Sequence, residues 1–205
     1  MNTSLLRTRH WLLAALLLLA IPTMWSCNSK TTLQKQLSEH QDQLKQIDDD
    51  TIQSYLRRNN LLAKATKTNS GLYVVNLVDG TGTTVKAGDR VRMKYIGRVL
   101  SNGAHPSSTG YPASPGDSRF PQGVIFDNSA DKNTQCGCAV FVAGTGLAPG
   151  FYEGLLLMRV GDRKLLLLPS RLGYGPSGYT DPNTRQVIVP SDSALLFDVE
   201  ILGIQ

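Results

Sequence analysis

The stretch of sequence that decides the fold is FVAGTGLAPGFYEGLLLMRVGDR, residues 141–163. It begins with β-forming residues and continues into a glycine-rich turn. Pro149-Gly150 then opens the clearest helix signal in this part of the chain, Phe151–Met158, and Gly161 ends it. We therefore expect one short helix here, placed between two strands.

Strands and turns surround this helix from Gly71 onward. The stretches that favour strands are Leu72–Val78, Arg90–Leu100, Val124–Phe126, Ala139–Ala143, Arg163–Leu168 and Ala194–Leu202. Residues 90–100 alternate basic and apolar side chains, which predicts one buried face and one face in water. Residues 104–123 are rich in Pro, Gly and Ser without periodicity, which indicates an inserted surface loop. The sequence thus predicts an α+β fold with one short helix over a twisted antiparallel sheet.

Residues 1–26 have the pattern of a secretory leader. Arg7 and Arg9 precede an apolar run, Trp11–Ile21, and at about eleven residues this run is too short for a mature membrane span, which takes about 20. The Ser26-Cys27 step that follows resembles a bacterial lipobox. This resemblance implies cleavage before Cys27, diacylation of Cys27 and a lipid anchor in the cell envelope, with the protein facing the periplasm. The alternatives are a plain signal peptide cut elsewhere and a signal anchor.

Residues 27–69 form a polar, helix-prone arm. Four apolar residues recur there at roughly helical spacing: Leu33, Leu37, Leu44 and Ile47. We expect the three acidic residues 48–50 to interrupt this pattern and Asp50 to cap a second helix, Thr51–Arg58. The apolar stripe is narrow, and no segment outside residues 70–205 is long enough to form a second core. Two interpretations remain: a tether with marginal helices, or an arm for dimerisation or for binding another polypeptide.

The composition and motifs argue against several functional classes. The formal net charge is +5, falling to about +3 without Arg7 and Arg9, and the basic residues are scattered, whereas nucleic-acid binding needs a clustered basic face. The three histidines give no catalytic triad, and no zinc-protease, phosphate-loop or EF-hand motif occurs. We therefore expect no nucleic-acid partner, no metal ion and no cofactor.

Cys136 and Cys138 flank a single glycine. This spacing is too short for an ordinary zinc half-site, and the partner ligands are missing. An exported protein meets oxidising conditions. Three interpretations stay open: reduced structural thiols, a strained and easily reduced disulfide, and an intermolecular or metal-binding role.

A set of aromatic residues appears in a fixed order among glycine turns between Gly71 and Gln205. The segments are Tyr95–Gly97, Phe126–Ser129, Phe141–Gly146, Gly150–Leu155, Val160–Arg163, Tyr174-Gly175, Val189-Pro190 and Leu196–Ile201. In this order they resemble the FKBP-type peptidyl-prolyl cis-trans isomerases over roughly two thirds of the chain. The resemblance implies an antiparallel half-barrel wrapped on one short helix at residues 70–205, after the leader and the arm.

The resemblance also implies a pocket between the helix and the sheet. Its catalytic residues would be Tyr95, Asp127 and Tyr174, with Tyr174 donating its hydroxyl to a substrate carbonyl and Asp127 orienting polar groups or bonding Tyr95. Its substrate-binding residues would be Phe126, Phe141, Leu147, Ala148, Phe151, Val189 and Phe197. Phe151 would form the floor under a proline ring. The pocket would take proline-containing polypeptides and, by family resemblance, macrolide-type inhibitors.

Such an isomerase needs no nucleophile, metal or redox cofactor. Rotation about a peptide bond costs about 18–20 kcal/mol because amide resonance is broken, and X–Pro isomers therefore interconvert slowly. A dry site that binds the twisted amide better than the planar one lowers this barrier.

Two features of the chain leave other functions open. The family usually has Trp where this chain has Phe151, and the segment between Gly146 and Gly150 is one residue short. The main alternative is a non-catalytic lipoprotein that binds clients, followed by an unrelated structural lipoprotein. The insert 104–123 is either disordered or contacts clients through Tyr111 and Phe120.

Overall fold

The computed structural model describes residues 31–100, 125–132, 134–144 and 146–205. The predicted leader 1–26, the lipidation site Cys27 and the insert 104–123 lie outside the described residues. The chain divides into two compact units, Met1–Leu37 and Ser38–Gln205. Residues 32–37 of the first unit are helical, with Leu33 and Leu37 exposed. The sheet and the site described below belong to the second unit.

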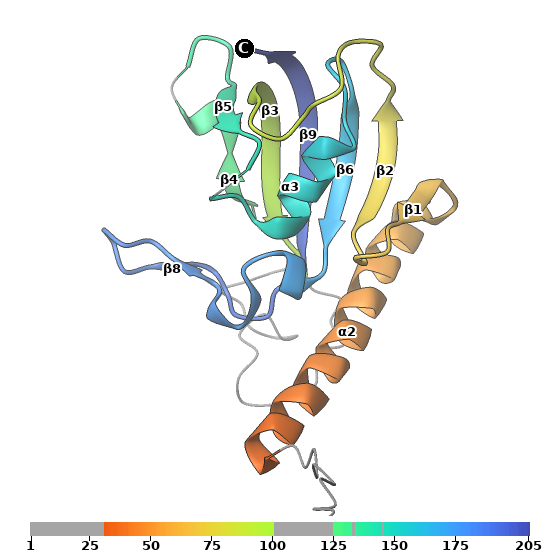
Figure 1. The fold of residues 1–205 in the computed structure, drawn as a ribbon, viewed down its shortest axis with the longest axis vertical. Helices are drawn as coiled ribbons and strands as arrows, with labels where there is room; N and C mark the ends of the chain where they lie inside the picture. Colours follow the sequence, from red (N-terminus) through yellow and green to blue (C-terminus); the bar gives the residue numbers. More distant parts are fainter. Residues whose placement is uncertain (1–30, 101–124, 133, 145) are drawn as a thin grey trace, which may run out of the picture. The chain divides into compact units, whose positions relative to one another are not determined.

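The centre of the fold is a seven-stranded antiparallel sheet (Figure 1). Its strands lie in the order β1 (Ala65–Lys67), β2 (Tyr73–Val78), β6 (Arg163–Leu168), β9 (Leu195–Ile204), β3 (Arg90–Val99) and β4 (Ile125–Asn128), and β5 (Ala139–Val142) also pairs with β3. β4 and β5 follow one another along β3, where Gly97 pairs with Asp127 and Val91 pairs with Phe141. A separate ladder joins β7 (Tyr179–Thr180) to β8 (Val187–Val189).

Two α-helices and four short 3₁₀ helices complete the described residues. They are α2 (Thr32–Arg58), α3 (Pro149–Leu156), η1 (Leu62–Lys64), η2 (Ser129–Lys132), η3 (Ser170–Leu172) and η4 (Gly175–Ser177). Every predicted strand is present with ends that differ by no more than two residues, and the predicted short helix is α3. β1 and the β7–β8 ladder were not predicted, because strands of two or three residues are too short to show a period. The α+β fold is confirmed.

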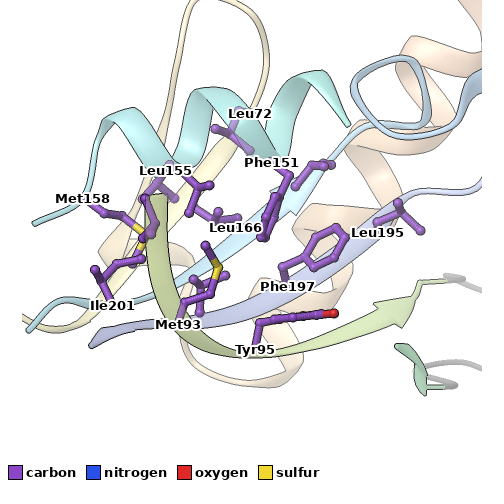
Figure 2. Close-up of a cluster of buried hydrophobic side chains, with 14 of the residues drawn as sticks. Leu72, Met93, Tyr95, Phe151, Leu155, Met158, Leu166, Leu195, Phe197 and Ile201 are labelled. Atoms are coloured by element: carbon purple, nitrogen blue, oxygen red, sulfur yellow. The ribbon is translucent and has the colours of Figure 1, made fainter. Parts of the chain in front are cut away.

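α3 packs closely on one face of the sheet, called here the inner face (Figure 2). Gly150 and Gly154 permit this approach, because a Cβ on Gly154 would lie 2.4 Å from Leu166 Cδ1. Phe151 and Leu155 extend from the helix into the cluster of buried side chains. The strands meet them with Met93, Tyr95, Leu166, Leu195, Phe197 and Ile201.

α2 contributes to a second apolar cluster, on what we call the outer face. Its residues Ile52 and Leu56 are fully buried. They pack with strand residues that alternate with those of the inner face, namely Tyr73, Val75, Leu165, Leu167 and Leu196. The expectation that no segment outside residues 70–205 adds to a second core is therefore wrong. β2, β6 and β9 bury side chains on both faces, and α2 covers the second one.

The predicted interruption at residues 48–50 is also wrong, because α2 continues unbroken to Arg58. Asp48 is only 1% exposed. Its Oδ2 accepts hydrogen bonds from the backbone N–H of Ser170 at 2.8 Å and from the Ser170 hydroxyl at 2.7 Å. Asp48 therefore joins the helix to the chain after β6 and does not end it.

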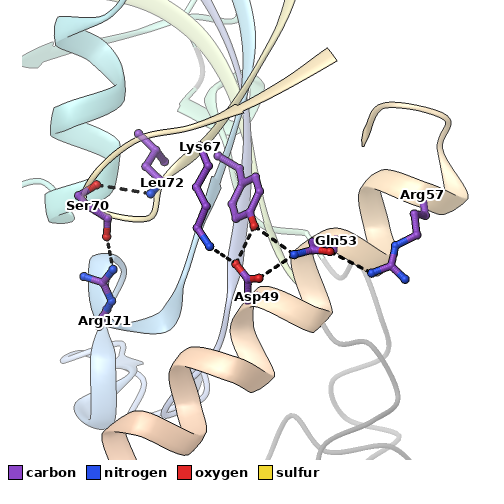
Figure 3. A network of polar contacts seen from close by, with 8 residues as sticks. Asp49, Gln53, Arg57, Lys67, Ser70, Leu72 and Arg171 are labelled. Carbon is purple, nitrogen blue, oxygen red and sulfur yellow. Dashed lines mark hydrogen bonds and ion pairs between the residues drawn. The ribbon is translucent and has the colours of Figure 1, made fainter. Parts of the chain in front are cut away.

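The neighbouring Asp49 makes a more exposed set of polar contacts (Figure 3). It accepts hydrogen bonds from the Tyr73 hydroxyl at 2.6 Å and from Gln53 Nε2 at 2.7 Å. Lys67 of β1 forms an ion pair with the same carboxylate. These contacts connect α2 to β1 and β2, so two adjacent acidic residues both hold the helix on the sheet.

Two further predictions concern cysteines and membranes. Cys136 and Cys138 form a disulfide, which decides among the three interpretations that the sequence left open. No helix in the described ranges combines the length and apolar character that crossing a bilayer requires.

Candidate active site

A cavity of about 120 Å³ lies between α3 and the inner face of the sheet. The residues that line it are Tyr95, Asp127, Phe141, Gly146, Leu147, Ala148, Phe151, Tyr174 and Phe197. The structure thus brings eight of the ten predicted pocket residues to one cavity. They come from β3, β4, β5, the segment just before α3, α3 itself, the segment between η3 and η4, and β9, so the cavity exists only in the assembled fold.

The floor and one wall of the cavity are aromatic. The ring of Phe151 lies 4.7 Å from that of Phe197 at an interplanar angle of 49°. The Tyr95 ring stands nearly edge-on to Phe141, with centroids 5.5 Å apart at 60°. Tilted and edge-to-face contacts of this kind are the favoured geometry between aromatic rings. Because the rings hold one another in place, they form a rigid apolar surface.

Tyr95 and Asp127 form the polar side of the cavity. The Tyr95 hydroxyl donates to Asp127 Oδ2 at 2.6 Å. Burial raises the pKa of Tyr95 well above its usual range, and the hydrogen bond to Asp127 raises it further. Tyr95 therefore remains a protonated donor at any physiological pH. The alternation of β3 turns Tyr95 inward, and the pairing of β4 with β3 brings Asp127 beside it.

The other carboxylate oxygen of Asp127 is also engaged. Its Oδ1 accepts the backbone N–H of Asn128 at 3.0 Å and pairs with Lys132 Nζ at 2.9 Å. Three donors thus fix the orientation of this carboxylate. Lys132 is a contact that sequence reasoning missed, and its only signal was a basic residue five positions after Asp127.

Tyr174 presents a hydroxyl of a different kind. It lies between η3 and η4, where its ring stacks on Tyr179 with centroids 5.4 Å apart. Burial raises the pKa of Tyr174, and the negative charge of Asp127 adds to the effect. Within the described residues, the structure gives this hydroxyl no hydrogen-bond partner. It is therefore available to a ligand in the cavity.

Phe126 and Val189 do not line the cavity, although the sequence placed them in it. The Phe126 ring packs edge-on to Phe197 at 5.6 Å and lies over Gly97, where a Cβ would come within 2.8 Å of Phe126 Cζ. Val189 is 1% exposed and belongs to the inner core. Val189 therefore supports the lining from the core, whereas Phe126 is partly exposed and packs against the lining residues Phe197 and Tyr174. Gly146, at a φ of 89°, lines the cavity without having been assigned a role.

A larger hollow of about 380 Å³ lies beside the disulfide. Lys94 and Ile96 contribute to it, and these residues alternate with the inward-facing Tyr95 along β3. Arg163, Asp198 and Glu200 also line it, and Tyr95 is the one aromatic residue among its lining. The smaller cavity is lined by five aromatic residues, which suit an apolar proline ring, and we therefore assign the isomerase site to it.

Comparison with known proteins identifies the family. Residues 81–202 match the model of the FKBP-type peptidyl-prolyl cis-trans isomerases. The chain belongs to this family. FK506-binding protein 2 of Dictyostelium discoideum is 32% identical over 120 residues, which are 58% of this chain and 68% of that protein. The FkpA isomerase of Aeromonas hydrophila is 30% identical over 75% of this chain but only 45% of its own length.

Solved structures support the FKBP fold. FkpA from Escherichia coli superposes with a TM-score of 0.53 at 24% identity, covering 82% of this chain and 65% of that one. AtFKBP13 gives a TM-score of 0.52 at 24% identity, covering 69% of this chain and 98% of that one. These structures confirm the predicted FKBP half-barrel, and the family model with the named isomerase relatives confirms the predicted family and isomerase activity.

Proposed function

We propose that this FKBP-type isomerase rotates X–Pro bonds of exported polypeptides in the aromatic cavity, with Tyr95, Asp127 and Tyr174 as its catalytic residues. One observation carries the proposal. The fixed Tyr95–Asp127 pair and the available Tyr174 hydroxyl converge on one apolar cavity that has Phe151 as its floor. An apolar floor suits a proline ring, and polar groups at the rim suit the peptide carbonyls on either side of it.

The cavity can favour the twisted amide in two ways. Aromatic walls exclude water, and a twisted amide has lost the resonance that makes the planar form polar, so it is the better guest for an apolar site. The Tyr174 hydroxyl can donate to a substrate carbonyl and hold one side of the rotating bond still. Asp127 is held by three donors and keeps Tyr95 in position while the other side turns.

The test is isomerisation of a short X–Pro peptide by the whole purified chain. A Tyr174→Phe/Asp127→Ala variant removes the available hydroxyl and the fixed carboxylate. The matched control is Tyr152→Phe/Asp131→Ala, because neither of these residues lines the cavity. We expect acceleration by the parent and the control, and loss of it in the cavity variant. A folded parent that gives no acceleration would refute the catalytic proposal.

A second candidate function is client binding without catalysis. Leu33 and Leu37 on α2 are 64% and 52% exposed, which gives the arm an apolar stripe. Phe151 also replaces the tryptophan usual in the family. If an unfolded, proline-free polypeptide binds equally to the parent and to the Tyr174→Phe/Asp127→Ala variant, and binding disappears in Leu33→Ser/Leu37→Ser, the arm is the binding surface.

We further propose that the mature protein begins at Cys27, is diacylated there and uses residues 27–69 to connect the membrane to the isomerase domain, residues 70–205, with Ile52, Leu56 and β1 packed on that domain's sheet. The basic and apolar leader and the Ser26-Cys27 step support this proposal. The protein would then lie in the cell envelope and face the periplasm. Fatty-acid labelling should be present in the parent and absent in Cys27→Ala.

The same cavity is proposed to take macrolide-type inhibitors. Support comes from the name of the Dictyostelium relative, which states that it binds FK506. Inhibition of X–Pro isomerisation by such a compound, with competition between compound and peptide, is the expected result. Inhibition that peptide cannot relieve would place the compound elsewhere.

A further inference from the structure

The disulfide between Cys136 and Cys138 closes a loop of a single residue, Gly137. Disulfides stabilise proteins mainly by restricting the unfolded chain, and the effect grows with the length of the loop they close. A bond across one residue restricts very little. Its contribution to stability is therefore small, and a structural role does not account for it.

The two sulfurs are in different environments. Cys136 is exposed, whereas Cys138 is only 4% exposed. Thiol–disulfide exchange needs an attacking thiolate to reach a sulfur, and this difference directs the attack to Cys136. The 380 Å³ hollow is lined by Cys136 and Gly137, so there is room beside the bond for a segment of another polypeptide.

Hydrogen bonds hold this turn independently of the S–S bond. Thr134 Oγ1 accepts the backbone N–H of Cys138 at 3.0 Å, and the N–H of Gly137 donates to the Thr134 carbonyl at 3.0 Å. The Ser129 hydroxyl donates to the Gly137 carbonyl at 2.8 Å and accepts the backbone N–H of Tyr95 at 3.1 Å. When the bond opens, the two thiols stay close together and can close again.

We propose that Cys136 and Cys138 form a dithiol–disulfide exchange site for cysteine-containing polypeptides, separate from the proline cavity. A client thiolate attacks Cys136 Sγ, the Cys136–Cys138 bond breaks, and Cys138 leaves as a thiolate that takes up a proton. A second client thiolate then attacks the client sulfur of this mixed disulfide and releases Cys136 as a thiolate. Two electrons pass from the client dithiol to the protein, the client disulfide forms, and no other oxidant takes part.

The reverse sequence reduces a client disulfide and restores the Cys136–Cys138 bond. Disulfides form in the oxidising compartments that exported polypeptides enter. Tyr95 links the two sites, since its ring lines the proline cavity and its backbone N–H is bonded to the serine that holds the disulfide turn. One protein could thus serve both kinds of slow step in the same client.

The test uses the whole chain with Cys27→Ser, which removes the one other cysteine of the sequence. The oxidised protein is mixed with a synthetic peptide that carries two cysteines, and the peptide disulfide is followed by mass spectrometry. We expect one equivalent of peptide to be oxidised, with the rate falling at least about tenfold in Cys136→Ala/Cys138→Ala. Equal rates with the parent and this variant would overturn the proposal.

Single variants identify the attacked sulfur. Incubated with the oxidised peptide, Cys138→Ala should accumulate a mixed disulfide at Cys136, because no second thiol resolves it. Cys136→Ala should accumulate none, because Cys138 is buried. A mixed disulfide that forms equally in both variants, or in neither, contradicts the proposal. Circular dichroism of each variant shows that the fold is intact, so a negative result cannot be ascribed to unfolding.

Discussion

The two faces of the sheet use the same strands for different purposes. In β6, Leu166 and Leu168 belong to the inner cluster, whereas Leu165 and Leu167 belong to the outer one. The inner face meets the eight-residue α3 and leaves a cavity among its aromatic rings. The outer face is covered by α2, with aliphatic side chains and buried acidic groups. Because side chains alternate along a strand, function and stability can be changed separately in one sheet.

The largest effect should come from truncating the outer cluster at Leu56→Ala. Leu56 is fully buried, and the loss of such a side chain costs about 2–5 kcal/mol, since a cavity remains. We expect urea unfolding to show this loss, while the isomerisation rate per folded molecule stays unchanged. Leu62→Ala, at a residue 42% exposed, is the matched control and should have little effect. A slower rate in folded Leu56→Ala would show that the faces are coupled.

The inner face could be predicted from the sequence to a large extent. Local patterns predicted the strands and the helix, and the resemblance to the FKBP family supplied eight of the nine residues that line the cavity. Part of the signal there is local, because Gly97 lies under the Phe126 ring and Gly154 lets α3 approach the sheet. Val189 lies in the inner core, and Phe126 contacts the lining rings of Tyr174 and Phe197, so the part of these two residues in substrate binding stays a prediction.

The outer face could not be predicted in the same way. Residues 48–50 of α2 form an acidic run that normally indicates an end or a bend in an exposed helix. The partner of Asp48 is Ser170, which lies 122 residues further along the chain. Nothing in the arm itself indicates that this serine will approach. Patterns of period 3.6 or 2 describe neighbours on one element, whereas the docking of α2 depends on contacts that form only after the sheet is complete.

The next prediction concerns the pH dependence of the outer face. Burial raises the pKa of Asp48 from 3.8 to about 7, although the hydrogen bonds from Ser170 oppose the shift. The folded state therefore binds this proton more tightly than the unfolded chain, and the contribution of Asp48 to stability is greatest below pH 4 and falls as the pH rises toward 7. In Asp48→Asn we expect this fall, about 1.4 kcal/mol per pH unit, to disappear from chemical denaturation measured across that range.

Asp49→Asn is the matched comparison, and its sign is opposite. Burial disfavours the charge of Asp49, but the bonds from Lys67, Tyr73 and Gln53 outweigh it and hold the pKa below its usual range. The contribution of Asp49 to the free energy of unfolding is thus present at neutral pH, and it is lost as the pH falls through the lowered pKa of Asp49. At pH 7 we expect Asp49→Asn to lower the unfolding free energy and Asp48→Asn to raise it. If both variants lowered the unfolding free energy at pH 7, ionised Asp48 would not destabilise the folded protein, and the prediction would be wrong.

A smaller effect is expected from Gly154→Ala on the inner face. The new methyl group would lie 2.4 Å from Leu166 Cδ1, so α3 or the sheet must shift, and such overpacking typically costs about 1–3 kcal/mol. Because α3 also carries Phe151, the isomerisation rate should fall together with the thermal midpoint. Gly144→Ala is the control, since a Cβ there meets nothing within 4 Å. Loss of stability without any loss of rate would show that the position of the helix does not set the cavity.

The smallest expected effects come from comparing two tyrosine–aspartate pairs with the same O···O distance. Tyr95 donates to Asp127 at 2.6 Å on the inner face, and Tyr73 donates to Asp49 at 2.6 Å beside α2. Removing either hydroxyl should cost about 0.5–1.5 kcal/mol of hydrogen bonding. In Tyr95→Phe we expect this loss in the transition state, as an isomerisation rate about two- to tenfold lower.

In Tyr73→Phe the same loss should appear only as lower stability. Lys67 and Gln53 continue to hold Asp49, so the decrease in the urea midpoint should be modest. The X–Pro isomerisation rate should not change, because neither Tyr73 nor Asp49 lines the aromatic cavity. A rate that falls equally in both variants would refute the separation of the two faces. A rate unchanged in Tyr95→Phe would instead leave Tyr174 as the hydroxyl on which catalysis depends and reduce the Tyr95–Asp127 pair to support for the fold.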